Sequence, residues 1–491
     1  MVDAVKGRGY GPTVDAKLDE FGQLFGEFVR AALESESSKE PPFRAVLRDH
    51  LGAEPTDLSV LAEQIPTWDQ ANLQLGLEAL FAVPGRSVTL VGIGGGQKRF
   101  MALSLSDLVN ERHFRPGSVE YENVAVGPGQ THPCILFGLA LLRDERGPAV
   151  LLVRRGEHHG PSPGLEVEAT STDERHAAAL LEELRRLMRE RNVFRGQMFS
   201  LESTMWGQLR VAFHERPSLA RDDVVLPADL LDDIERHTIE IGRRAEDLRA
   251  SARHLKRGLL LYGPPGTGKT HTVKWLSGEL ATSTVITLAG GSLGIAGPVC
   301  RLAREVAPSL VVLEDVDLVA EERTMHAGSG PLLFELLNEL DGMADDADVA
   351  VVLTTNRADL LEPALAARPG RVDLAVELPL PDAGCRLRLF HLYARGLQLE
   401  VDDLDAIIER TGGVTASFFR ELLRQAALEA SDEGTTSIGD RHLAVALDRL
   451  LTRTGSLTRV LLGAARPSET RVGFPGPHGW LEAPQIHIET D

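Results

Sequence analysis

The sequence predicts an α/β fold, in which a doubly wound parallel sheet is preceded by an N-terminal α/β or α+β accessory domain and followed by a small C-terminal helical domain. Two observations support this class. From residue 216 onward, apolar runs alternate with helical segments, and the runs occupy residues 258–262, 284–288, 310–313 and 349–353. Continuous apolar runs of this length are typical of strands that a parallel sheet buries on both faces. After residue 381 such runs cease, and the pattern to residue 462 is helical.

The order of these sequence patterns along the chain predicts the domain organisation. A length of 491 residues suggests about three domains. A helical N-terminal region comes first, and the accessory domain follows, with aliphatic strand-like runs at residues 87–91 and 149–153. The parallel sheet, the small helical domain and a disordered tail rich in Pro and Gly complete the chain. The expected divisions are residues 1–85, 86–215, 216–378, 379–463 and 464–491.

One amphipathic pattern lies near the N-terminus. Apolar side chains recur there at helical spacing, at Phe21, Leu24, Phe25, Phe28 and Val29. The favoured interpretation is a helix that packs on its own domain, and the alternative is a helix that binds a partner protein.

Composition limits the classes of function. Asp and Glu number 72 against 52 Lys and Arg, and the resulting charge of −20 disfavours binding to nucleic-acid phosphates. The longest apolar stretch, residues 134–142, is too short for a membrane span, and the N-terminus lacks the apolar core of a secretory signal. Cys134, Cys300 and Cys385 form no CxxC pair, which argues against a disulfide framework or a zinc cluster. We therefore expect a cytoplasmic protein without a membrane span or nucleic-acid partner.

The strongest motif is a glycine-rich loop between the strand at residues 258–262 and a helical segment. The pattern G-x-x-x-x-G-K-[ST] is matched in full by Gly263, Pro264, Pro265, Gly266, Thr267, Gly268, Lys269 and Thr270. Glycines allow successive backbone N–H groups to turn toward phosphate oxygens, and the helix N-terminus favours negative charge. Lys269 is expected to reach the β- and γ-phosphates of ATP, and the Thr270 hydroxyl to coordinate Mg²⁺.

Polar residues follow two of the predicted strands. Glu314 and Asp315 come directly after the run at residues 310–313, and Asn356 follows the run that ends near residue 353. Strand C-termini of open α/β sheets line the ligand crevice. Two adjacent acids there suit ATP hydrolysis, because one carboxylate can hold the hydrated metal while the other polarises the attacking water. Asn356 is expected to contact the γ-phosphate or to orient that water.

From about residue 220 to 462, the chain resembles the AAA family of P-loop NTPases. Residues 356–365 and 368–373 are similar to the family stretch TNRPDxLDPALxRPGRFD, and residues 411–417 resemble the segment that opens a helix of its lid domain. The resemblance implies that Arg368 and Arg371 are arginine fingers that reach the ATP of a neighbouring subunit. It also implies a homo-oligomeric ring, usually a hexamer, which couples ATP hydrolysis to remodelling of a protein. The N-terminal domain would then bind the protein substrate or an adaptor.

Two departures from the family pattern affect the expected function. The family order is Asp-Glu, so by position Glu314 takes the metal-side role and Asp315 the water-polarising role, and the shorter Asp315 favours slower turnover. The segment at residues 290–298, where the family places an aromatic pore loop, contains no aromatic residue, which puts substrate threading in doubt.

The predicted function is an ATP-hydrolysing remodeller of protein complexes. The alternative is a nucleotide-dependent assembly or regulatory module with slow turnover, and a nucleic-acid motor is the weakest reading because of the negative charge.

Overall fold

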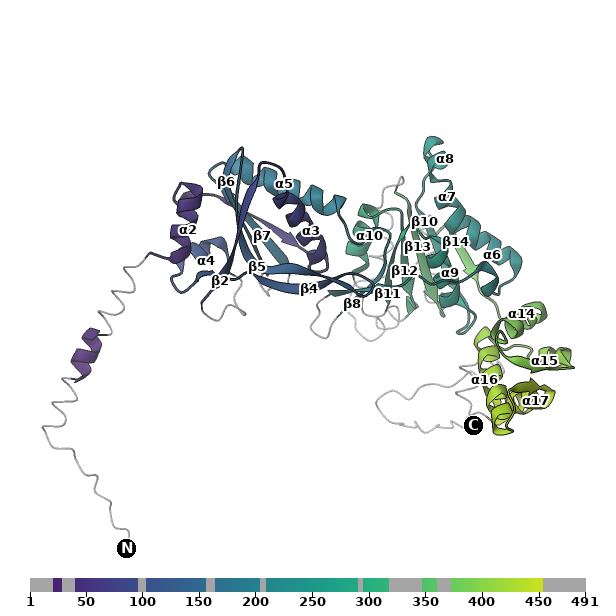
Figure 1. Ribbon diagram of the computed structural model, residues 1–491. Coiled ribbons are helices and arrows are strands. Elements are labelled where there is room, and N and C mark those ends of the chain that lie inside the picture. Colours follow the sequence, from purple (N-terminus) through teal and green to yellow (C-terminus); the bar gives the residue numbers. More distant parts are fainter. Residues whose placement is uncertain are drawn as a thin grey trace, which may run out of the picture. The chain divides into compact units, whose positions relative to one another are not determined.

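The computed structural model describes residues 21–28, 40–95, 103–155, 164–203, 209–289, 295–317, 347–359 and 372–453 (Figure 1). The chain divides into two units, one made of residues 1–193 and 202–213, and the other of residues 194–201 and 214–491. The tail expected at residues 464–491 lies outside the described residues. Among the residues that are described, no helix is both long and apolar enough to span a bilayer.

The first unit is built on an antiparallel sheet. Its strand order is β1-β7-β6-β5-β2-β3, and β4 also pairs with β5. The strands are β1 (Val60–Ile65), β2 (Ser87–Gly94), β3 (Arg115–Gly117), β4 (Glu120–Gly127), β5 (Gln130–Asp144), β6 (Gly147–Arg155) and β7 (Leu165–Ser171).

Helices cover both faces of this sheet. One core forms where α3 (Gln70–Phe81) and α5 (Glu174–Glu190) pack together, and the other lies beneath α2 (Pro42–Leu51) and α4 (Leu105–Asn110). Neighbouring residues of β6 point to opposite faces, so that Leu151 joins the first core and Leu152 the second. This explains why the run at residues 149–153 is apolar throughout although its sheet is antiparallel.

The expected boundary at residue 85 does not appear in this unit. β1 is hydrogen-bonded along its length to β7, and α3 contributes to the same core as α5. Residues 42–81 and 87–171 therefore share a sheet and its cores. The pairing of β1 with a strand some 100 residues away leaves no local mark in the sequence, which is why the N-terminal region resembled a separate helical segment.

The second unit contains the parallel sheet that the sequence predicted, and the α/β fold class is confirmed. The strand order is β14-β10-β13-β12-β11-β8-β9, and the pairs from β14 to β8 are parallel. The last strand of this order, β9, is counted with the first unit except for His214. The strands are β8 (Met198–Ser203), β9 (Leu209–His214), β10 (Arg257–Tyr262), β11 (Thr284–Ala289), β12 (Ser309–Glu314), β13 (Val349–Thr355) and β14 (Leu374–Glu377).

Helices pack against this sheet at alternate strand residues. Leu259 and Leu261 of β10 contribute to one core with α6 (Ala228–Glu235) and with α9 (Lys269–Glu279), which contains the buried Trp275. Two short helices, α7 (Ile241–Arg243) and α8 (Ala245–Ala250), precede β10, and α10 (Ala296–Glu305) precedes β12. The sheet also takes in β8, whose residues 198–200 pair with β11. The predicted accessory domain, residues 86–215, includes this strand, whereas the structure pairs it with the parallel sheet.

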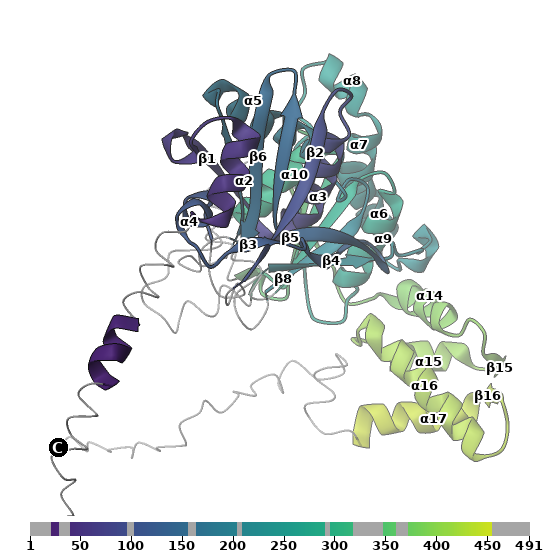
Figure 2. The same cartoon turned by 60° about the vertical axis from the view of Figure 1, so that its left-hand side comes forward.

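A small helical domain follows β14, as expected. Its helices α14 (Ala383–Tyr393), α15 (Leu404–Arg410), α16 (Ala416–Asp432) and α17 (Asp440–Asp448) enclose one core around Phe418 and Phe419 (Figure 2). The domain also contains a two-stranded parallel sheet, β15 (Gln398–Glu400) with β16 (Ser437–Gly439), which the sequence did not indicate. We refer to this domain as the lid.

The amphipathic pattern near the N-terminus does form a helix, at residues 21–28. Its apolar side chains Phe21, Leu24, Phe25 and Phe28 are 55–69% exposed. The favoured expectation, a helix that packs on its own domain, therefore differs from what the structure shows for these eight residues.

Candidate nucleotide-binding site

The loop between β10 and α9 contains three glycines with positive φ. The angle is 141° at Gly263, 79° at Gly266 and 106° at Gly268, values that residues with side chains rarely adopt. A β-carbon at Gly263 would also lie 2.4 Å from the carbonyl oxygen of Leu378. The N-cap of α9 is Gly268, which has no side chain to occupy the first N–H groups of the helix. These groups and the helix dipole favour an anion at this position.

Lys269 is the cation of this loop. Only 7% of the residue is exposed, and its Nζ donates hydrogen bonds to the carbonyl oxygens of Gly263 (2.8 Å) and Pro264 (2.9 Å). Burial lowers the pKa of Lys269, while the nearby carboxylates of Asp315 and Asp317 act to raise it. The ammonium group is therefore held within the loop and faces the acids at the end of β12.

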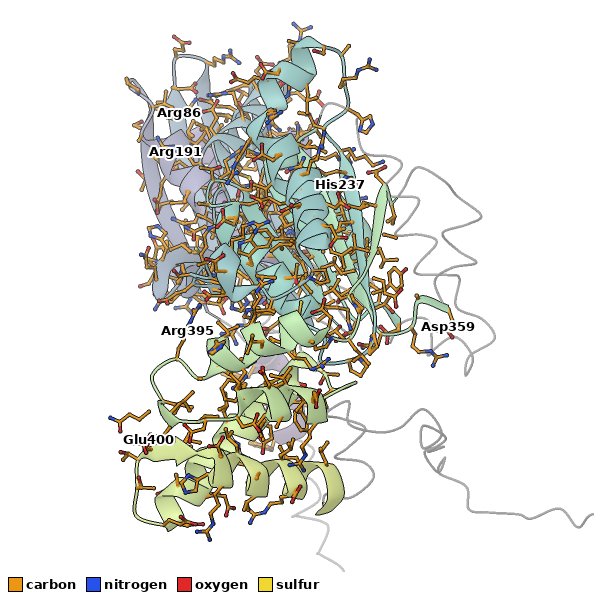
Figure 3. All side chains as sticks on the ribbon, turned by 90° about the vertical axis from the view of Figure 1, so that its right-hand side faces the viewer. Arg86, Arg191, His237, Asp359, Arg395 and Glu400 are labelled. Carbon is orange, nitrogen blue, oxygen red and sulfur yellow. The ribbon has the colours of Figure 1, made fainter. Side chains whose placement is uncertain are left out.

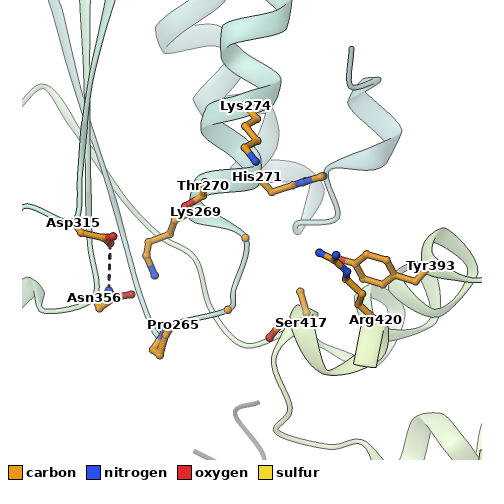
Figure 4. A pocket seen from close by; sticks show the side chains of 13 residues that line it. Pro265, Lys269, Thr270, His271, Lys274, Asp315, Asn356, Tyr393, Ser417 and Arg420 are labelled. Carbon is orange, nitrogen blue, oxygen red and sulfur yellow. Dashed lines mark hydrogen bonds between the residues drawn. The ribbon is translucent and has the colours of Figure 1, made fainter. Parts of the chain in front are cut away.

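Asp315 and Asn356 meet across the ends of two neighbouring strands. They follow β12 and β13, which are paired in parallel, and Asn356 Nδ2 lies 3.5 Å from Asp315 Oδ1. Asp315 has a φ of 52°, an uncommon conformation for a residue other than glycine. Its amide donates to the Thr354 hydroxyl at 3.0 Å, which helps to hold the turn. Both side chains are exposed, and Figure 4 shows them facing each other beside Lys269.

Glu314 differs from Asp315 in its environment. It is half-buried, and burial, together with the neighbouring Asp315, raises its pKa, whereas Lys274 acts to lower it. Asp315 lines the cleft described next, and Glu314 is not among the lining residues. The metal-side role of Glu314 therefore stays a prediction.

These groups surround a cleft of about 340 Å³, which is within the usual size range for small-molecule sites. It is lined by residues of the loop and α9, of the strand ends, and of the lid (Figure 4). They are Pro265, Gly266, Gly268, Lys269, Thr270, His271, Lys274, Asp315, Asn356, Tyr393, Ala416, Ser417 and Arg420.

The lid contributes side chains to the cleft that were not among the predicted site residues. Tyr393 ends α14 and Arg420 lies in the first turns of α16, and Figure 4 shows the two side by side. Burial raises the pKa of Tyr393, and the Arg420 guanidinium opposes this shift. The Ser417 amide donates to the carbonyl oxygen of Gly266 at 3.4 Å, so the lid touches the phosphate-binding loop directly. Because the docking of the lid on the loop is a long-range contact, no local spacing identified Tyr393 or Arg420.

His271 and Lys274, also missed, follow the loop on α9. The Nε2 atom of His271 is hydrogen-bonded to the carbonyl oxygen of Asp223 at 3.1 Å. Asp223 in turn forms an ion pair with Arg395, which lies just after α14 (Figure 3), and this pairing lowers the pKa of Asp223. Lys274 lies four residues after Thr270, a spacing that places both on one face of the helix, and this signal could have identified it.

Two expected features lie wholly or partly outside the described residues. Arg368 and Arg371, the expected arginine fingers, lie in residues 360–371, for which no structure is described. The expected pore segment is described only from Ile295 onward.

Thr267 of the phosphate-binding loop lies within the described residues, and its hydroxyl donates to the Pro264 carbonyl oxygen at 2.9 Å inside the loop.

A nucleoside triphosphate with Mg²⁺ fits this set of groups. The N–H groups at the start of α9 and the Lys269 ammonium suit phosphate oxygens. The exposed Thr270 hydroxyl and the carboxylates at the end of β12 are the oxygen ligands that Mg²⁺ prefers. The fold and the cleft together define a P-loop nucleotide-binding domain with a helical lid.

The comparison with protein families agrees with this class. Residues 259–380 match the model described as the ATPase family associated with various cellular activities (AAA). The chain therefore contains an AAA domain, and the resemblance read from the sequence is confirmed. This family is a class of ATP hydrolases, with ATP and Mg²⁺ as the expected nucleotide and metal.

Curated relatives match about half of the chain. A proteasome-activating nucleotidase from Pyrococcus horikoshii is 34% identical over 209 residues, which are 40% of this chain and 52% of that protein. An ATP-dependent zinc metalloprotease, FtsH 3 from Sphaerobacter thermophilus, is 32% identical over 52% of this chain and 54% of its own length. FtsH from Thermus thermophilus is 32% identical over 48% and 40%, respectively. The chain thus spans about half the length of the curated relatives it matches, and the zinc-protease motif His-Glu-x-x-His does not occur in its 491 residues.

Proposed function

We propose that the protein hydrolyses ATP to ADP and phosphate and uses this reaction to remodel a protein partner or complex. The observation that carries the proposal is the convergence of Lys269, Asp315 and Asn356 on one cleft, to which the lid contributes Arg420. Phosphoryl transfer to water requires a cation that binds the phosphates, together with groups that position the attacking water. Lys269 supplies the cation, and the carboxylate of Asp315 and the amide of Asn356 supply the other groups at the ends of adjacent parallel strands.

Each group has a definite part in the proposed reaction. The loop amides and Lys269 hold the phosphates, and Asn356 orients the attacking water beside Asp315. Asp315 accepts a proton from that water as the new P–O bond forms and the bond to the β-phosphate breaks. Thr270 and Glu314 would hold a magnesium ion, which when bound offsets the negative charge of the phosphates.

A measurement of steady-state phosphate release by the full chain tests this proposal. The wild type should hydrolyse ATP, and Asp315→Asn should bind ATP without hydrolysing it. Partners retained by the Asp315→Asn variant in ATP can then be added to the wild type. Stimulated turnover on the order of 1 s⁻¹ or faster supports a remodelling enzyme. ATP binding with no turnover, even with the retained partner, contradicts it.

We further propose a homo-oligomeric ring, expected as a hexamer, in which Arg368 and Arg371 act on the ATP of the neighbouring subunit. A guanidinium at that position stabilises charge on the transferred phosphoryl group, worth about 10³–10⁵ in rate where arginine fingers have been measured. Subunits that carry Arg371→Ala can be mixed with subunits that carry Lys269→Ala. Each alone should be nearly inactive, and mixed rings should recover activity, because an intact finger can then meet an intact loop. Co-assembly without recovery contradicts action between subunits.

The N-terminal unit is the proposed binding site for the protein substrate or adaptor, because it is a separately folded unit outside the ATPase domain. The alternative function, a regulatory module with slow turnover, is favoured by one observation, the absence of aromatic residues at residues 290–298. Large aromatic side chains supply most contact area per residue for gripping a polypeptide. We accordingly expect the protein to dissociate its partner rather than to unfold a stable protein. Unfolding can be measured with a fluorescent reporter fused to the partner, in the presence of a trap that prevents refolding. The reporter should then keep its fluorescence.

The proposed location is the cytoplasm. Cys134, Cys300 and Cys385 form no disulfide bond, as is usual in a reducing compartment. Fractionation of cells that produce the full-length protein tests this point, and recovery in a membrane or secreted fraction contradicts it.

A further inference from the structure

Asp317 is a buried acid next to the proposed catalytic residues that the reaction described above does not use. It lies two residues after Asp315, is 6% exposed, and is not among the residues that line the cleft. Buried carboxylates are rare unless they are paired or hydrogen-bonded. The contacts that Asp317 makes therefore indicate its role.

Two hydrogen bonds to Asp317 within the described residues come from the segment that carries Asn356. The Thr355 hydroxyl donates to Asp317 Oδ1 at 3.0 Å, and the Asn356 amide donates to the same oxygen at 3.3 Å. The Thr355 hydroxyl also accepts a hydrogen bond from the Arg357 amide at 2.9 Å. One carboxylate oxygen thus fixes the backbone of Asn356 directly and that of Arg357 through Thr355.

The neighbouring residues connect the same two turns. The Val316 amide donates to the Thr354 carbonyl oxygen at 3.0 Å, and the Asp315 amide donates to the Thr354 hydroxyl at 3.0 Å. The turn after β12 and the end of β13 are therefore joined at four points around the Asp315–Asn356 pair. A rotation of the Asn356 backbone would require the loss of the Asp317 contacts.

We infer that Asp317 is a positioning residue, which acts through Thr355 and the Asn356 backbone to hold the Asn356 amide beside Asp315. It lies outside the residues that line the cleft. This inference rests on the proposed function, since it concerns the hydrolysis step of that same site. Loss of this positioning should lower kcat rather than nucleotide affinity. A displaced Asn356 misorients the attacking water but leaves the phosphate-binding loop and Lys269 unchanged.

The chain offers substitutions that separate the hydrogen bond from the charge. Both donors reach a single oxygen, so Asp317→Asn can keep an acceptor there while removing the negative charge. Thr355→Val removes the shared hydroxyl with little change in shape, and Thr355→Ser restores it. Thr287→Val is a matched control, because Thr287 lies on β11 of the same sheet, beyond β12, and donates to the Phe199 carbonyl oxygen instead.

The test measures kcat, KM and ADP affinity of the full chain. Thr355→Val should lower kcat about tenfold and leave KM and ADP affinity within about twofold. Thr355→Ser and Thr287→Val should stay within about threefold of the wild-type kcat. Asp317→Asn, which keeps the acceptor but loses the charge near Lys269, should lower kcat less than Thr355→Val does. In an Asn356→Ala background, Thr355→Val should cause no further loss, because residues that act as a unit are not additive.

Several results would overturn the inference. They are an unchanged kcat in Thr355→Val, a loss of ADP affinity that matches the loss of kcat, or an equal further loss in the Asn356→Ala background. Thermal unfolding checks that the variants fold, and Thr355→Ala replaces Thr355→Val if that variant does not. If the wild type binds ATP without hydrolysing it, the proposed function fails and the inference falls with it. If the wild type turns over and Asn356→Ala slows it, a neutral Thr355→Val defeats the inference alone.

Discussion

Gly266 in the phosphate-binding loop and Ser417 at the start of α16 lie so close that a β-carbon on Gly266 would be 2.6 Å from the Ser417 hydroxyl oxygen. The same β-carbon would lie 3.0 Å from the Thr415 hydroxyl oxygen. Gly266 is therefore required for two reasons, its positive φ of 79° and its contact with the lid. This contact gives the lid a direct means of responding to what the loop binds.

Gly266→Ala should weaken ADP binding more than Gly268→Ala does. Both substitutions strain a positive-φ position, by about 1–2 kcal/mol, but a β-carbon at Gly268 meets nothing within 4 Å. Only Gly266→Ala must also displace the lid. We expect its ADP affinity to fall about tenfold below that of Gly268→Ala, the equivalent of about 1.4 kcal/mol.

Calorimetry of ADP binding checks this prediction, with Gly266→Ala/Ser417→Ala as the rescue. Removal of the Ser417 hydroxyl relieves the closest contact, so the double variant should recover part of the affinity. Equal losses in the two single variants, with no recovery in the double variant, would show that contact between the loop and the lid does not matter for binding.

Lys269→Ala should abolish tight ATP binding, with a loss of about 100-fold or more, because charge-assisted hydrogen bonds to phosphate are the strong ones. Lys274→Ala is the matched control, since Lys274 lies on the same helix and also lines the cleft. Its effect should be much smaller because it is outside the loop. Titration calorimetry with ATP measures both, and near-wild-type affinity in Lys269→Ala would contradict the assignment of the loop.

The parallel sheet and the phosphate-binding loop were predictable because both are local. The central strands β10 to β13 are buried on both faces and therefore appear in the sequence as continuous apolar runs. The loop requires Gly263, Gly266 and Gly268 at positions with positive φ. Asp315 and Asn356 could be paired from the sequence because the C-terminal ends of parallel strands meet at one edge.

The features that escaped prediction depend on long-range contacts. β8 joins the ATPase sheet through pairing with β11, across more than 80 residues of sequence, and β1 joins the first sheet through β7. Tyr393 and Arg420 reach the cleft only because the lid docks on the loop. Hydrophobic periodicity describes how one segment is buried and says nothing about which distant segment covers it.

Cys134 should resist alkylation in the folded protein. Burial, reinforced by Glu78 and Glu122, raises the pKa of its thiol to about 12, and burial raises the pKa of Cys385 to about 11. At pH 8 roughly one Cys134 in ten thousand is then a thiolate, which is the reactive form. Mass spectrometry of peptides after iodoacetamide treatment should show little labelling at pH 8, a rise of about tenfold per pH unit, and full labelling in denaturant. Rapid labelling of native Cys134 at pH 8 would contradict this account of its environment.

Substitutions of the two adjacent acids should affect different quantities. Asp315 is exposed in the cleft beside Asn356, whereas Glu314 is half-buried and outside the lining. Asp315→Asn should therefore keep ATP affinity and lose hydrolysis by about 10²–10⁴, the usual contribution of a general base. Glu314→Gln should raise the Mg²⁺ concentration needed for half-maximal hydrolysis, because it removes a charged oxygen ligand. The double variant Glu314→Asp/Asp315→Glu is the control, since it keeps both charges and should turn over at least as fast as the wild type. Phosphate release measured across a magnesium titration distinguishes the roles, and an Asp315→Asn enzyme that turns over normally while Glu314→Gln binds ATP without hydrolysis would reverse the assignment.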